Sequence, residues 1–566
     1  MSRRKIFKRF VYIKITGEIN MAEGEVIFVR KATGLVRTAG VVTTAAISFG
    51  YLTQGITYYP SMDVYWFPGL NMPIAYGLAG FIMIWPLFIA IFLTQAMPRS
   101  ASDYVAVARI VNPTISYIGT LIQWQNWAWV ATATAPGIVQ CFGQACVMYG
   151  KMTGNTSLVA LMQPIATFGT NVLLAVSIIS LIVFALLCIV GMRISGWVLN
   201  IMFAGMLVGV VLGTASLVWY ALQGQAATAA AWDRAYGAGA WKEIEDVAIA
   251  NGWRNYVEKS TGDPNMWGWP GKWDWSITLA GVLPACYAWW GMELANQVAG
   301  EIKEPSKTYP TAMAIVLVIA TIWYMLTASC MMMAFGEHYP MYVYNLIEGY
   351  SANYKINPEV FPMTTFFTGS ISGNPALAFI IHFFTGLNLP SGALACFIVC
   401  SRVIFALSFD RVFPSIFARV NDRWRTPHWA IALTVIYGLL WLPVYVYLPY
   451  VAAWNTYASC ALRYMFMGWA ALIMPYKFPD LYERGYPYRI AGIPLLTIIG
   501  LFGTVTSTWL FVNNIVNIGR EVASFESTMV QVFWITFSVV LWSFFYNYRK
   551  SKGIDMDKLY QEIPPA

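Results

Sequence analysis

Charged residues are scarce in this sequence. Only 11% of its 566 residues are Asp, Glu, Lys or Arg, whereas 58% are hydrophobic. Soluble domains usually carry about 25% charged residues, which they need for a hydrated surface. The scarcity of charge excludes an ordinary soluble protein, so the exterior of the folded chain must face lipid.

The sequence also has little of what metal and nucleotide sites require. Its three histidines, His338, His382 and His428, lie far apart, and its eight cysteines form no CxxC pair or Cys/His cluster at metal spacing. A glycine-rich phosphate loop with its lysine is absent. We therefore expect no metal site, no cofactor and no ATP hydrolysis. The net charge of +8 needs no nucleic acid, because basic residues gather beside the first apolar run, where they suit an anionic membrane leaflet.

Long apolar windows recur along nearly the whole chain. A helix needs roughly 20 such residues to cross a bilayer, whereas β-barrel strands would show about ten residues of alternating polarity. The pattern predicts an all-α polytopic membrane protein. We expect about twelve spans, near 38–58, 72–94, 115–148, 171–191, 195–220, 276–297, 311–335, 375–407, 429–447, 450–475, 490–512 and 529–547.

Lys and Arg concentrate in the terminal segments and in the loops on the same side of the predicted spans. This asymmetry predicts that both termini lie in the cytoplasm. We expect a multi-pass protein of the plasma membrane. The cytoplasmic ends would be an N-terminal segment at 1–37 and a tail at 549–566. The longest hydrophilic insertion, at 223–274, would be an outer loop.

Two predicted spans carry polar and glycine-bearing interruptions. Span one contains Ser48 to Gly55, and span six contains Pro284 to Glu293. Five spans separate the two, as an inverted five-plus-five repeat requires. A broken helix frees backbone N–H and C=O groups for a substrate or a cation, although glycine and proline also serve close packing in membrane helices. Span eight is too long for one crossing, so we expect that it either continues into the cytoplasm or is broken near Asn388 to Gly392, where Pro390 removes a backbone donor.

Three motifs carry a resemblance to a known family. The segment Tyr287-Ala288-Trp289-Trp290-Gly291-Met292-Glu293, continuing to Pro305 and Pro310, resembles the sixth-helix signature of the amino acid, polyamine and organocation permeases. The segment Met97 to Tyr104 is similar to their inner loop after helix two, with Ser100-Ala101 in place of the usual glycine pair. Ser401-Arg402 through Arg425-Thr426-Pro427 is similar to their end of helix eight and the following loop. The resemblance implies a ten-helix inverted-repeat core at 38–475, as in sodium-coupled carriers, with two further helices at 476–548.

The resemblance also implies a substrate site on the first helix. In these permeases the broken first helix binds the substrate carboxylate through backbone amides, and the matching residues are Thr53, Gln54, Gly55 and Ile56. The family usually has Gly-Ser-Gly there, so Gln54 departs from its pattern.

On the sixth helix, the matching aromatic residue is Tyr287, four residues before the family's glycine, Gly291. The resemblance implies that Tyr287 acts as a lid over the substrate, and that Ala288 and Trp289 offer backbone oxygens to its amino group. Tyr287 is otherwise an interfacial or core tyrosine. Glu293, an acid within a span, is a candidate for pH-dependent gating or a buried structural acid.

The coupling ion, H⁺ or Na⁺, stays open. Proton-coupled relatives often keep a lysine in helix five, but Met206 occupies that position here. Either a cation binds nearby, with Ser391 as a candidate hydroxyl ligand, or the protein is an exchanger or facilitator. Ser391 is alternatively bonded to its own helix. His382 is a candidate proton relay or a histidine hydrogen-bonded to a neighbour.

These observations predict a secondary transporter that moves amino acids by alternating access, and not an enzyme. A polyamine or other amine is the alternative substrate, but a dication would need acids along the pathway, and Glu293 is the one acid within the predicted spans. Other classes are a channel, a transporter-like sensor and a membrane-embedded enzyme. The last would need converging titratable groups, whereas Glu293, His382 and Arg463 are scattered in the sequence.

Overall fold

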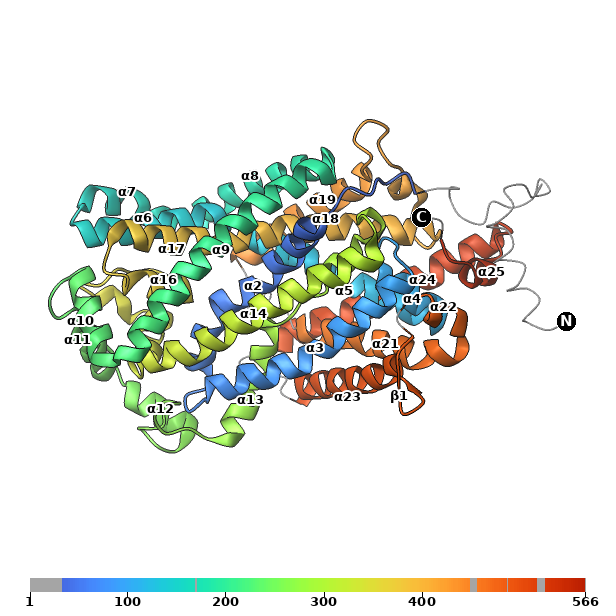
Figure 1. Cartoon of the computed structure of the whole chain (residues 1–566). Helices are drawn as coiled ribbons and strands as arrows, with labels where there is room; N and C mark the ends of the chain where they lie inside the picture. The colour runs from blue at the N-terminus through green and yellow to red at the C-terminus, as the bar shows by residue number, and fades with distance from the viewer. Residues whose placement is uncertain (1–32, 168–169, 448–455, 486, 517–524, 565–566) are drawn as a thin grey trace.

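The computed structural model describes residues 33–167, 170–447, 456–485, 487–516 and 525–564 (Figure 1). This part of the chain is mostly helical. It includes one pair of short antiparallel strands, β1 (Arg489–Ile490) and β2 (Ile493–Pro494).

Each range predicted as a span contains helix. The helices are α2 (Val41–Trp66), α3 (Met72–Ala96), α5 (Pro113–Thr134), α6 (Gly137–Thr153), α8 (Thr170–Ile189), α9 (Met192–Gln223), α13 (Trp275–Ala288), α14 (Pro305–Phe335), α17 (Pro375–Gly386), α18 (Asn388–Phe409), α19 (His428–Tyr447), α21 (Thr456–Lys477), α23 (Leu495–Val516) and α24 (Phe525–Ser551). Among the described residues, eight segments are long and apolar enough to cross a membrane: α3, α8, α9, α14, α17 together with α18, α19, α23 and α24. The chain is therefore a multi-pass membrane protein.

Shorter helices connect these segments. The α-helices are α4 (Ser102–Ile110), α7 (Thr156–Ala166), α10 (Gln225–Tyr236), α11 (Ala240–Ala250), α12 (Trp253–Thr261), α15 (His338–Ile347), α16 (Thr364–Ser370), α22 (Pro479–Glu483) and α25 (Met556–Gln561). The 3₁₀ turns are η1 (Leu294–Gln297), η2 (Ala299–Glu301), η3 (Tyr350–Asn353) and η4 (Ser415–Ala418).

The two ends of the helix bundle differ (Figure 1). Helices α4, α22 and α25 lie at one end, which we call the terminal end. Helices α10, α11 and α12 lie at the other, the capped end, and with α15 they form the cap. Within the cap, Arg254 donates to both carboxylate oxygens of Glu337, at 2.5 and 3.0 Å. The hydrophilic insertion at 223–274 is thus a folded structure.

The core of the bundle is formed by α2 and α18. Every residue of α18 is buried, as is every residue of α2 from Thr44 to Thr57, and the two helices pack against each other. Helices α8, α19, α23 and α24 instead expose large apolar side chains, among them Leu186, Leu440 and Val540. Such exposure suits a surface in contact with lipid.

The expected interruption of the first span is wrong. Helix α2 runs without a break from Val41 to Trp66, through the polar patch at Ser48 to Gly55. Its hydroxyls bond back to the helix: Thr53 Oγ1 donates to Phe49 O at 2.7 Å, and Thr57 Oγ1 donates to Thr53 O at 3.1 Å. Glycine serves close packing here, because a Cβ on Gly50 would lie 2.3 Å from Ser391 Oγ.

The other two expected breaks are confirmed. Helix α13 ends at Ala288, and the chain continues through turns into η1 and η2 rather than as α-helix. Span eight consists of α17 and α18, which meet at Leu387, just before the predicted position.

Candidate functional site

The break after α13 packs directly against α2. Gly291 has a φ of +88°, a conformation that glycine adopts without strain. A Cβ on Gly291 would lie 2.1 Å from Tyr51 Cδ1, and a Cβ on Gly55 would lie 2.3 Å from Ala288 Cα. Any larger residue at these two positions would push the helix break away from α2.

The structure brings the predicted residues of the first and sixth helices together, but not through free amides of α2. Because α2 stays helical, the backbone N–H groups of Thr53, Gln54, Gly55 and Ile56 lie within a continuous helix. The expected cradle of unpaired amides at these four residues is therefore wrong. The unwound backbone lies instead on the partner segment after Ala288.

Thr53, Gln54 and Ile56 connect α2 to other elements. Gln54 Nε2 donates to Leu389 O at 3.0 Å, and Asn388 Nδ2 donates to Thr53 O at 2.8 Å, so both bonds join α2 to the start of α18. Thr364 Oγ1 donates to Ile56 O at 3.1 Å. Gln54, which departs from the family pattern, thus holds the junction of α17 and α18 against α2.

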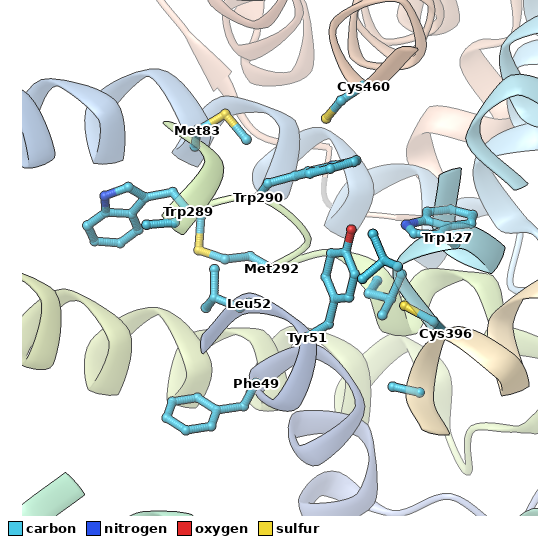
Figure 2. Close-up of a cluster of buried hydrophobic side chains, with 14 of the residues drawn as sticks. Phe49, Tyr51, Leu52, Met83, Trp127, Trp289, Trp290, Met292, Cys396 and Cys460 are labelled. Carbon is cyan, nitrogen blue, oxygen red and sulfur yellow. The ribbon is translucent and has the colours of Figure 1, made fainter. Parts of the chain in front are cut away.

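The buried side chains of Tyr51, Trp127 and Trp290 lie near one another (Figure 2), and each carries a polar hydrogen-bond donor. Figure 2 shows the Tyr51 hydroxyl directed toward the space between the two indoles, near Cys396. The Tyr51 and Trp290 rings meet edge to face, with centroids 5.8 Å apart. Tyr51 Oη, Trp127 Nε1 and Trp290 Nε1 are buried and have no hydrogen-bond partner among the described residues. Three such donors suit a small molecule with acceptor oxygens.

Tyr287 lies on the capped side of Trp290 and is only half-buried. Its ring is 5.0 Å from that of Trp290 and 4.5 Å from that of Tyr59 on α2. Trp289 is held differently, because its Nε1 donates to Tyr76 O on α3 at 3.0 Å. The lid role of Tyr287 stays a prediction.

Glu293 belongs to a buried ion network. Arg463 on α21 donates from Nη1 to Glu293 Oε1 at 2.8 Å and from Nε to Asp103 Oδ2 on α4. Tyr464 Oη donates to the same Glu293 oxygen at 2.9 Å, and the Arg463 guanidinium lies 5.0 Å from the Trp127 ring centroid. One cation thus serves two carboxylates next to the helix break. The network carries a net negative charge when both acids are ionised.

Asp103 and Arg463 were missed as site residues. Arg463 is, with Arg402, one of two basic residues inside the predicted spans, and an intramembrane charge signals a partner. Its partners lie 170 and 360 positions away, which no local pattern reveals.

A second buried ion pair joins Arg402 and Glu301. Arg402 donates to Glu301 from Nε at 2.7 Å and from Nη2 at 3.1 Å, and both side chains are buried. Glu301 O accepts from Thr38 N and Ala39 N, directly before α2. This cluster ties η2, α18 and the start of α2 together.

Ser391 and His382 have different surroundings. Ser391 Oγ is buried against Gly50 and has no hydrogen-bond partner among the described residues, so it is not the helix-bonded hydroxyl of the alternative interpretation. His382 is hydrogen-bonded, with Nδ1 3.0 Å from Thr365 Oγ1 and Nε2 3.1 Å from Gln144 Oε1. No three His, Cys, Asp or Glu side chains gather as a metal site in the described part of the chain.

Comparison with known proteins gives a family match over most of the chain. Residues 34–545 match the family model described as amino acid permease. The chain is 28% identical over 158 residues to the general amino-acid permease GAP1 of Saccharomyces cerevisiae, covering 28% of this chain and 24% of that protein. It is 24% identical over 245 residues to an uncharacterised transporter of Rhizobium meliloti, covering 43% of this chain and 47% of that protein. The chain thus aligns with about a quarter and about half of the lengths of these relatives.

Proposed function

Because this chain belongs to the amino acid permease family, we propose that it is a secondary transporter that carries amino acids across the plasma membrane by alternating access. It would cross the membrane about twelve times with both termini in the cytoplasm, which makes the terminal end cytoplasmic and the capped end external. Its ten-helix core would be an inverted repeat. The observation that carries the proposal is the unwound segment after Ala288, packed on Tyr51 in the buried centre of the bundle.

The chemistry around this segment suits a zwitterion. Helix α13 ends there, and a helix C-terminus has a negative partial charge that favours an ammonium group. The hydroxyl of Tyr51 and the indole N–H groups of Trp127 and Trp290 have no partner in the described part of the chain, and such donors favour a carboxylate. The substrate would therefore lie between the end of α13 and α5, rather than over the amides of α2.

Side-chain contacts at both ends of the pathway support alternating access. The ion pair of Glu301 and Arg402 would close the cytoplasmic end, and Tyr287 with Tyr59 would close the external side. Both closures join α2 or its flanks to the segments around the helix break. Tilting these segments would open one end at a time.

Uptake by reconstituted vesicles tests the proposal. Purified protein in liposomes is offered labelled amino acids under imposed proton, sodium and counter-substrate gradients. The proposal predicts saturable uptake that is accelerated by unlabelled amino acid inside the vesicles. Uptake of no amino acid or amine under any of these gradients would contradict it, and an ohmic current would instead indicate a channel.

A polyamine or other amine is the second candidate substrate. The net negative charge of Asp103, Glu293 and Arg463 beside the helix break favours it, because an amine cation would restore neutrality there. Competition of a polyamine with labelled amino acid in the same vesicles distinguishes the two. Uptake of polyamine alone would favour this second candidate.

A further inference from the structure

Among the residues that the structure describes, buried acids are paired with arginine, with one exception. The part of the chain that the structure describes has five buried Asp or Glu residues. Four form ion pairs: Asp103 and Glu293 with Arg463, Glu301 with Arg402, and Asp410 with Arg109. The fifth, Asp63, has an exposure of 0% and no ion pair.

Asp63 lies in the last turn of α2, beyond the predicted end of span one. The sequence indicates Glu293 as the one acid within the predicted spans. Helix α2 is longer than its predicted span, and it carries Asp63 as a further buried acid. Asp63 Oδ2 accepts a hydrogen bond from Tyr76 Oη on α3 at 2.8 Å, and Oδ1 has no hydrogen-bond partner among the described residues.

The titratable groups next to Asp63 are uncharged near neutral pH. They are Tyr59 on α2, Tyr76 on α3, Cys286 on α13 and Tyr339 on α15. None of these groups supplies a cation to balance an ionised carboxylate.

The charged residues of the elements that pack against α2 are engaged elsewhere. In the cap, Glu337 pairs with Arg254, His338 stacks on Trp241 with centroids 3.5 Å apart, and Glu348 accepts from Tyr65 Oη at 2.5 Å. The charges of α9, α14 and α18 lie near the first turn of α2, about 30 Å along the helix from Asp63. They are Arg193, Lys307 and Arg402.

A carboxylate buried without a cation is strongly disfavoured, and such a group takes up a proton instead. When the external end opens, water reaches Asp63 and the ionised form becomes favourable. We propose that Asp63 is a proton-binding residue, and that closure of the external end of the pathway takes up one proton at its carboxyl group. The inference rests on the proposed transport function, which it deepens by assigning a proton site.

Asp63 is connected to the candidate substrate site. Tyr76 donates to Asp63 through its hydroxyl and accepts from Trp289 Nε1 through its carbonyl, so one residue of α3 contacts both the acid and the helix break. Above Asp63, Tyr256 of the cap donates to Tyr65 O on α2 at 2.7 Å. Movement of either contact would expose the acid, which is how opening and proton release would be coupled.

Counterflow in proteoliposomes tests this inference. Vesicles loaded with the twenty unlabelled amino acids are given a labelled mixture of the same amino acids, and the outer pH is stepped from about 8 to about 5. An equilibrium linked to one proton changes by at most about tenfold per pH unit, and closure is favoured as the pH falls. Wild-type counterflow is expected to rise with external acidification until Asp63 is fully protonated.

The variant Asp63→Asn is neutral at every pH, so its counterflow should lose this dependence while remaining active near pH 8. The matched control, Asp246→Asn, removes an exposed acid from the cap and should keep the wild-type profile. Tyr76→Phe deletes the hydrogen bond that favours the ionised acid, so it should move the midpoint to higher pH with its slope retained.

An Asp63→Asn profile that matches the wild type would overturn the inference. A wild-type counterflow that does not change with pH would also overturn the inference, but it would leave the proposed transport function intact. If Asp63→Asn does not fold, Tyr76→Phe decides, and an unmoved midpoint overturns the inference. Wild-type vesicles that exchange no amino acid at any pH would overturn both the inference and the proposed function.

Discussion

Replacing Arg463 with leucine tests the ion network beside the helix break. The change removes the cation from Glu293 and Asp103, whose side chains are 2% and 6% exposed. Breaking a buried ion pair by removing one partner costs about 3–5 kcal/mol, because an unpaired charge remains buried. That is a large fraction of a typical stability of about 5–15 kcal/mol. We expect Arg463→Leu to lower the apparent unfolding temperature sharply and to abolish counterflow.

Neutralising the stranded acids should reverse most of this loss. The triple variant Arg463→Leu, Glu293→Gln, Asp103→Asn has no buried charge left in the network, and such replacements are often close to neutral for stability. A thermal unfolding series in detergent micelles measures both variants. Arg484→Leu, which removes an exposed arginine, is the matched control. An unchanged unfolding temperature for Arg463→Leu, or no recovery in the triple variant, would refute the reasoning.

Two further variants test the helix break and the cap. Gly291→Ala places a methyl group against Tyr51 at a positive φ, which should cost about 1–3 kcal/mol in apparent stability and remove most counterflow. Gly40→Ala, with open space around it, should change neither. In the cap, burial alone would raise the pKa of Glu243, but hydrogen bonds from the N–H groups of residues 355–357 outweigh it and lower that pKa. The cap should therefore resist proteolysis above the usual pKa of glutamate, and it should lose this protection as the pH falls through the lowered pKa of Glu243. The variant Glu243→Gln should be cleaved faster than the wild type at neutral pH.

The interruption of the sixth helix could be predicted because the local sequence determines it. Pro284 and Gly291 lie within eight positions of each other in an apolar run, and the structure ends the helix between them. The first helix carries glycine as well, yet α2 is continuous. Gly50 and Gly55 permit close contact with Ser391 and Ala288, and no pattern in a single sequence distinguishes a glycine at a contact from a glycine at a break.

The charged parts of the site depend on contacts that the sequence does not display. Arg463 meets Glu293 across 170 positions, and the three-dimensional packing of α21 against α4 and α5 creates that contact. Asp63 was outside the predicted first span because a hydropathy window ends at polar residues, whereas α2 continues to Trp66 beneath the cap. Its lack of a cation is a property of the folded state alone.

Hydrogen exchange with and without substrate tests the central claim most directly. The amino acid that accelerates counterflow is added to the purified protein, and the exchange of backbone amides is followed by mass spectrometry. Binding at the unwound segment predicts slower exchange in residues 287–293 and in the α5 segment around Trp127, with little change in the continuous α2. Protection confined to other helices, with 287–293 unaffected, would contradict the assignment of the site.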